Sequence, residues 1–135
     1  MIKTICSLIF HNLLGWKSYV NVPYFDKCII CVAPHTSNFD LFIGKLFYAA
    51  AGRKASFVMK KEWFVGPLDY IFRNWMGGIP VNRGHGTALI TELIEIANSS
   101  DTFRLALTPE GTRKATPKWH LGFYVIASQA KLPIV

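Results

Sequence analysis

The residues best suited to chemistry in this sequence are His35 and Asp40, which stand five positions apart after an apolar stretch. A carboxylate that binds one ring nitrogen of a histidine fixes the tautomer and leaves the other nitrogen free to act as a general base. An aspartate in the first turn of a helix is also favoured by the helix dipole, and a histidine in a loop is ordinary. The spacing alone therefore leaves a general base and a structural loop equally open.

Three further groups of charged residues follow apolar stretches. Lys60 and Lys61 stand after one such stretch, and taken alone they are typical of a solvated turn. Arg83 lies in a glycine-rich turn ahead of a predicted helix, where backbone N–H groups and a guanidinium can bind a phosphate. Glu110 either pairs with Arg113 as a loop salt bridge or binds hydroxyl groups of a substrate.

Motifs of several common enzyme classes do not occur in the sequence. It contains no G-x-S-x-G of a serine hydrolase, no G-x-G-x-x-G of a dinucleotide site, no H-E-x-x-H of a zinc enzyme and no P-loop. A histidine base without a nucleophilic serine or cysteine motif suggests that it activates a hydroxyl group of the substrate itself.

The hydrophobic pattern predicts the elements that must position these residues. Short apolar runs predict strands, and apolar residues at helical spacing predict helices. The expected strands are 27–33, 55–59, 79–81 and 103–107, with the start of a fifth at 132–135, and the expected helices are 39–50, 67–75, 87–98 and 121–130. In the 39–50 helix, Phe39 and Phe42 belong to the apolar row, which we expect to face the core.

The alternation of strands and helices predicts an α/β fold, with a mainly parallel central sheet flanked by helices. Ligands of such sheets bind beyond the carboxyl ends of the strands. Because all the charged groups described above follow predicted strands, we expect them to gather at one edge of the sheet.

The composition indicates one compact domain with an excess of positive charge. Hydrophobic residues make up 51% of the 135 residues and charged residues only 17%, so the chain can bury a core and is not a disordered tail. The net charge of +7 fits nucleic acid, an anionic membrane surface or a phosphorylated substrate. Because the aromatic residues mostly follow helical spacing instead of alternating with basic residues, we expect no nucleic-acid partner.

The cysteines favour a reducing compartment and predict no metal site. Cys6, Cys28 and Cys31 are an odd number in apolar surroundings, which argues against a disulfide framework. Cys28 and Cys31 form a C-x-x-C, but within a strand a spacing of three puts the two thiols on opposite faces. With no second pair of ligands for zinc, we expect two small core residues.

Residues 1–20 are expected to form an amphipathic helix at the N-terminus. The segment has no run of about 18 apolar residues, so no transmembrane helix is predicted, and His11 with Asn12 interrupts the apolar core that a signal peptide requires. Such a helix can lie in a membrane interface or pack on the core of its own domain, and the sequence leaves both interpretations open.

Three blocks in order resemble the glycerolipid acyltransferase family, typified by lysophosphatidic acid acyltransferase. They are the H-x4-D block from His35 to Asp40, the sequence Gly-Ile-Pro-Val-Asn-Arg at 78–83, and Pro-Glu-Gly-Thr-Arg at 109–113. Residues 132–135 look like the start of a fourth block, so we expect 21–135 to be an acyltransferase domain that is incomplete at its C-terminal end. Lys60 and Lys61 fall where such proteins often carry a basic residue.

The resemblance implies transfer of a fatty acyl group from an acyl-carrier-protein or coenzyme A thioester to the free hydroxyl of a lysophospholipid, with no cofactor. His35 would take the hydroxyl proton, and Asp40 would orient the imidazole and stabilise the imidazolium. Arg83 would hold the phosphate, assisted by Lys60 or Lys61. The substrate-binding residues that the resemblance implies are Lys60, Lys61, Arg83, Glu110, Gly111, Thr112 and Arg113.

The same resemblance implies a peripheral or monotopic protein at the cytoplasmic face of the membrane, with the membrane surface as a partner. Two alternatives stay open. The acceptor could be a phosphate-free lyso-lipid, such as an acylated amino acid, or the chain could be a non-catalytic fragment that binds anionic lipid through its charge of +7.

Overall fold

Four short parallel strands form the centre of the computed structural model, which describes residues 1–82 and 86–135. The strands are β1 (Lys27–Cys31), β2 (Ser56–Lys60), β3 (Gly78–Val81) and β4 (Phe103–Leu107). Their order across the sheet is β1-β4-β2-β3, and every neighbouring pair is parallel. The expected α/β fold with a parallel sheet is therefore confirmed.

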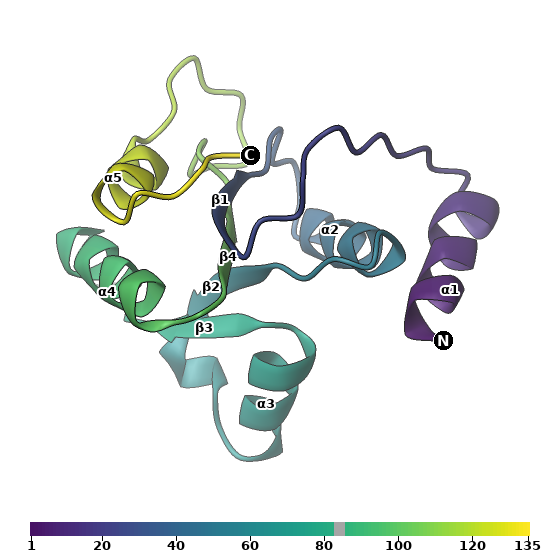
Figure 1. Ribbon diagram of the computed structural model, residues 1–135, viewed down its shortest axis with the longest axis horizontal. Helices are drawn as coiled ribbons and strands as arrows, with labels where there is room; N and C mark the ends of the chain where they lie inside the picture. Colours follow the sequence, from purple (N-terminus) through teal and green to yellow (C-terminus); the bar gives the residue numbers. More distant parts are fainter. Residues whose placement is uncertain (83–85) are drawn as a thin grey trace.

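Helices cover both faces of this sheet (Figure 1). The helices are α1 (Ile2–Ser7), α2 (Phe39–Ala50), α3 (Pro67–Tyr70), α4 (Gly86–Ser99) and α5 (Gly122–Gln129). Helix α1 continues as a π-helical segment, Leu8–Leu13, and α3 continues as another, Ile71–Trp75. Helices α4 and α5 lie on one face of the sheet, α2 lies on the other, and α1 packs outside α2 (Figure 1).

The core is divided between the two faces because successive side chains of a strand point to opposite sides. Ile29 and Leu105 are fully buried in the cluster formed with α4 and α5, whereas Cys28 and Ile30 are buried in the cluster on the α2 side. Cys31 packs against the first cluster, so the two thiols of the C-x-x-C lie on opposite faces, as predicted. Burial raises the pKa of both thiols, which is the behaviour of core cysteines and not of reactive ones.

The N-terminal helix is shorter than the expected segment 1–20. It ends near Leu13, and Gly15 follows with a φ of 67°, a left-handed conformation that commonly terminates helices. One side of the helix packs on α2 through Phe10, which is buried with its ring 5.7 Å from that of Phe47. Within the described residues, no helix combines the length and the apolar character needed to cross a bilayer.

The end of the chain pairs with the outer edge of β1. Ile134 forms a parallel bridge with Ile29, the Ile29 N–H donates to the Pro133 carbonyl at 2.9 Å, and the Val135 N–H donates to the Ile29 carbonyl at 2.8 Å. Residues 132–135, which were expected to start a fifth strand, thus form a single β-bridge beside β1, on the side away from β4.

The fully buried β4 residue Leu105 provides a test of this core. Leu105→Ala removes apolar contacts and leaves a cavity, so we expect the free energy of unfolding to fall by about 3 kcal/mol. Urea unfolding followed by circular dichroism measures the change. Leu121→Ala is the matched control, because Leu121 is 66% exposed and its truncation should cost about 0.5 kcal/mol or less. Equal losses in the two variants would contradict the described core.

Candidate active site

His35 and Asp40 come together at the carboxyl end of β1. His35 lies in the loop after the strand and Asp40 lies in the first turn of α2, and the distance from His35 Nδ1 to Asp40 Oδ2 is 3.1 Å. Both side chains are partly exposed. Because the carboxylate occupies Nδ1, Nε2 is the ring nitrogen that can accept a proton from a substrate.

Asp40 is held in place by the loop that precedes it. The backbone N–H groups of Thr36 and Ser37 donate to Asp40 Oδ2 at 2.7 and 2.9 Å. These two hydrogen bonds lower the pKa of Asp40 below its ordinary value, and the bond from Ser37 has the largest effect. The hydrogen bond with His35 makes a smaller contribution. The carboxylate is therefore ionised at neutral pH and can stabilise a protonated imidazole.

The sequence of this loop explains why α2 begins where it does. Asn38 occupies the cap position, and the Ser37 hydroxyl oxygen accepts a hydrogen bond from the Phe39 N–H at 3.0 Å. This bond satisfies one of the backbone donors that every helix leaves unpaired at its start. Asp40 is thereby fixed in the first helical turn, with its side chain directed back to His35.

Glu110 connects the loop after β4 to His35, the candidate base. The His35 backbone N–H donates to Glu110 Oε2 at 2.7 Å. Among the described residues Glu110 forms no ion pair with Arg113, so the loop salt bridge considered above is wrong. Glu110 reaches the His35 backbone instead because the register of β1 and β4 sets Cys31 opposite Leu107. This pairing places the loops that follow the two strands side by side.

Arg113 joins the two loops, and Thr112 acts within the second of them. Arg113 Nη2 donates to the Asn38 side-chain oxygen, which joins the third sequence block to the first. The Thr112 hydroxyl oxygen accepts a hydrogen bond from the Lys114 N–H at 3.2 Å, within the loop itself. Sequence reasoning missed Asn38 because its partner lies 75 positions away in the chain.

Gly111 closes the turn that carries Glu110. Its N–H donates to the Thr108 carbonyl at 3.2 Å, and its φ is 64°, a backbone conformation that residues other than glycine rarely adopt. A methyl carbon at this position would lie 2.6 Å from Cδ2 of His120, which also holds the turn through a 2.8 Å hydrogen bond from its own N–H to the Pro109 carbonyl. His120 was missed in the sequence because no motif marks it.

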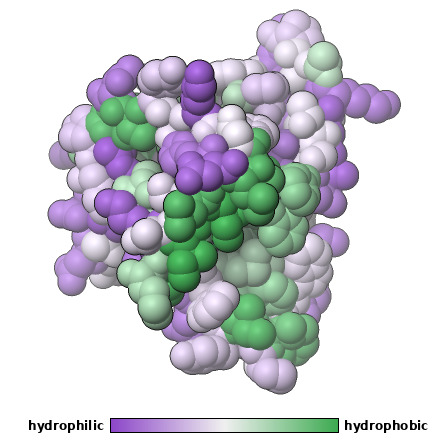
Figure 2. Space-filling view, turned by 90° about the vertical axis from the view of Figure 1, so that its right-hand side faces the viewer, coloured by the Kyte–Doolittle hydropathy of each residue, from purple (hydrophilic) through white to green (hydrophobic). Residues whose placement is uncertain are grey.

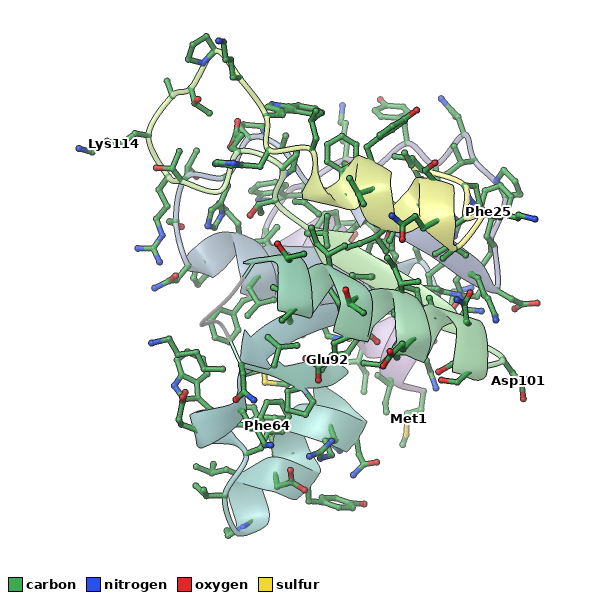
Figure 3. The ribbon with its side chains drawn as sticks, turned by 90° about the vertical axis from the view of Figure 1, so that its left-hand side faces the viewer. Met1, Phe25, Phe64, Glu92, Asp101 and Lys114 are labelled. Carbon is green, nitrogen blue, oxygen red and sulfur yellow. The ribbon has the colours of Figure 1, made fainter. Side chains whose placement is uncertain are left out.

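The remaining predicted residues are Lys60 and Lys61, at the end of β2, and Arg83. Lys60 ends β2 and Lys61 follows it, both exposed at the carboxyl edge of the sheet. In the described part of the chain, no hydrogen bond or ion pair joins either lysine to His35 or Asp40. Arg83 lies outside the described residues. Figure 3 shows Lys114, which follows β4, on the side where α2 begins, whereas Asp101, which precedes β4, lies on the opposite side.

A comparison with protein families gives a match over most of the chain. The family model described as Acyltransferase matches residues 17–135, which include every candidate site residue. The chain therefore belongs to this acyltransferase family, which includes the lysophosphatidic acid acyltransferases. Comparisons with curated proteins and with solved structures gave no match.

Substitution of Asp40 tests whether its carboxylate supports acyl transfer. Asp40→Asn keeps the size of the side chain but removes the charge that stabilises protonated His35, so we expect kcat to fall by about 100-fold or more, with little change in KM. Release of free thiol from an acyl thioester donor measures the rate. Asp101→Asn, at the opposite edge of the sheet, should keep normal activity. Full activity of Asp40→Asn would contradict the assignment.

Gly111→Ala tests the turn that carries Glu110. The positive φ and the close approach to His120 both oppose a methyl group, so the turn must shift and the hydrogen bond that Glu110 accepts from the His35 backbone N–H must weaken. We expect about a tenfold or greater loss of kcat in a protein that still folds. Gly44→Ala is the control, because a methyl group in the middle of α2 would meet nothing within 4 Å. Equal activities of the two variants would contradict this role of Gly111.

Proposed function

We propose that the protein transfers a fatty acyl group from an acyl-carrier-protein or coenzyme A thioester to the free hydroxyl of a lysophospholipid, with lysophosphatidate as the model acceptor. The observation that carries the proposal is the hydrogen bond between His35 and an ionised Asp40, in a chain of the acyltransferase family. A general base next to a carboxylate, with no serine or cysteine motif, fits direct attack by the acceptor hydroxyl on the thioester.

The proposed reaction needs one proton carrier. His35 Nε2 takes the proton of the acceptor hydroxyl while the oxygen attacks the thioester carbonyl carbon, and the negative charge of Asp40 stabilises the imidazolium that forms. The tetrahedral intermediate then expels the thiolate, which takes the proton back from His35. General-base assistance of this kind contributes about 10²- to 10⁴-fold, and correct positioning of the two substrates contributes the rest. No cofactor takes part, because the thioester already carries an activated acyl group.

Positive charge near the site supports a phosphate-bearing acceptor. Lys60 and Lys61 are exposed at the carboxyl edge of the sheet, and Arg113 is fixed by Asn38 in the loop that also holds Glu110. A phosphate group can be bound by such cations at the edge where the hydroxyl must reach His35. Arg83 is included in the proposed phosphate site on the basis of its sequence block alone.

We also propose a location at the cytoplasmic face of a membrane, as a peripheral or monotopic protein, and the N-terminal helix supports contact with a membrane surface. While Phe10 packs on α2, other apolar side chains of the helix stay exposed, among them Ile2, Ile5 and Leu8. Figure 2 shows a large hydrophobic patch at the centre of the face on which α1 lies. Lys3 is the charged residue of this helix, and a helix of apolar and basic residues is suited to the surface of an anionic bilayer.

The proposed function is tested by a transfer assay on detergent-solubilised protein. Carrier-protein and coenzyme A thioesters are each combined with lysophosphatidate and with a phosphate-free lyso-lipid, and the acylated products are measured by mass spectrometry. We expect lysophosphatidate to be acylated, and His35→Ala to lose at least about 100-fold in kcat. Arg83→Ala should lower the rate of acylation of lysophosphatidate far more than that of the neutral acceptor.

Three results would contradict parts of this proposal. Acylation of only the phosphate-free lyso-lipid would show that the acceptor is a phosphate-free lipid and not a lysophospholipid. Full activity of His35→Ala would remove His35 as the base. Binding of anionic vesicles without any transfer would identify a lipid-binding protein in place of an enzyme.

A further inference from the structure

The start of α2 departs from the pattern of its sequence in two ways. The apolar row predicts that Phe39 and Phe42 face the core, but they are 65% and 56% exposed, so this expectation is wrong. Asn38 stands at the cap position, where asparagine commonly accepts a hydrogen bond from the helix backbone, but its side chain makes no such bond. The Ser37 hydroxyl, one position earlier, accepts the Phe39 N–H instead. The side chain of Asn38 is therefore available to a partner outside α2.

That partner is Arg113, in the loop that follows β4. Arg113 Nη2 donates a hydrogen bond to the side-chain oxygen of Asn38. Within the residues that the structure describes, Arg113 forms no ion pair with an acidic side chain. A guanidinium carries five N–H donors, so the bond to Asn38 fixes its position and leaves other donors for a second partner.

The bond between Asn38 and Arg113 is a second link between two loops that are already joined once. The first link is the 2.7 Å hydrogen bond from the His35 N–H to Glu110 Oε2. His35 and Asn38 are three positions apart, as are Glu110 and Arg113, and the two strands that lead into the loops are parallel. Two loops joined by one hydrogen bond can pivot about it, whereas a second bond at another point opposes that motion.

The segment held between these two links carries the groups that orient the base. The N–H groups of Thr36 and Ser37 donate to Asp40 Oδ2, and Asp40 Oδ2 lies 3.1 Å from His35 Nδ1. A tilt of the segment would change all three contacts together. A displacement of about 1 Å at a catalytic group can cost about 100-fold in rate, so the orientation of this loop matters for a general base.

We propose that Asn38 is a positioning residue, which acts through Arg113 to hold the loop of His35 in the orientation that general-base catalysis needs. Its effect on catalysis rests on the proposed function. The side-chain oxygen of Asn38 is an acceptor, and so are the oxygens of a phosphate, so this atom does not bind the acceptor lipid through a phosphate. Loss of Asn38 should therefore slow the reaction with phosphate-bearing and phosphate-free acceptors alike.

The test is a double-mutant cycle with two acceptors. Asn38→Ala, Arg113→Ala and the double variant are assayed in detergent with lysophosphatidate and with a phosphate-free lyso-lipid. Asn38→Ala should lower kcat by about tenfold or more for both acceptors, with little change in KM. The double variant should be no slower than Arg113→Ala, because the two side chains act as one unit. Asn38→Asp should keep most of the wild-type rate, since a carboxylate also accepts a hydrogen bond from arginine.

Asn98→Ala is the matched control. Asn98 is an exposed residue of α4, on the other face of the sheet from α2, and its substitution should leave kcat unchanged. Thermal unfolding followed by circular dichroism checks that each variant is folded before its rate is compared.

Three outcomes would overturn the inference. Losses that multiply in the double variant would show that Asn38 and Arg113 act independently. A loss in Asn38→Ala that is confined to lysophosphatidate would assign Asn38 to phosphate binding. An Asn38→Asp protein as slow as Asn38→Ala would show that the acceptor oxygen at this position is not what the loop requires.

Hydrogen exchange of the His35 backbone N–H tests the link without any substrate. This N–H is bonded to Glu110, so its exchange rate reports whether the two loops stay together. Asn38→Ala and Arg113→Ala should each raise the rate by about tenfold, and Asn38→Asp should keep it near the wild-type value. If the wild-type protein acylates no lyso-lipid, the proposed function fails and the exchange rates still test the link. Unchanged exchange in Asn38→Ala overturns this inference whatever the transfer assay shows.

Discussion

Strands β1 and β4 pair in parallel, with Cys31 opposite Leu107, and the arrangement of the site depends on this register. The pairing brings together two loops that lie far apart in the sequence, so that the His35 backbone donates to Glu110 at 2.7 Å and Arg113 reaches Asn38. A slip of one residue would turn every side chain of the strand to the other face and separate these partners. The same register therefore organises both the core and the site.

The polar groups of the site are ordered without being deeply buried. Within the described residues the buried side chains are apolar, and His35 and Asp40 stay partly exposed at the edge of the sheet. Backbone N–H groups of Ser37 and Thr36 keep Asp40 ionised, which costs little desolvation because the carboxylate stays near water. This partial exposure leaves the candidate base His35 open to the proposed substrate, while Glu110, on the turn closed by Gly111, holds the His35 backbone N–H.

Local features of the site could be predicted from the sequence, and features that depend on the sheet could not. The contact between His35 and Asp40 spans only five positions of chain, so the spacing indicated it as one of two open interpretations, and the resemblance to the family favoured it. The partner of Glu110 depends on β4 lying next to β1, and apolar periodicity does not specify the order of strands. The exposure of Phe39 was missed for a related reason, because periodicity predicts which side of a helix is apolar but not where the sheet beneath it ends.

The central claim is that Asp40 holds His35 in the tautomer that leaves Nε2 as the basic nitrogen. Nuclear magnetic resonance of the protein labelled with ¹⁵N at histidine, with the imidazole of His35 neutral, measures this directly. The account predicts that wild-type His35 carries its proton on Nδ1 and that Asp40→Asn loses this preference. A wild-type His35 with its proton on Nε2, or a tautomer that Asp40→Asn leaves unchanged, would contradict it.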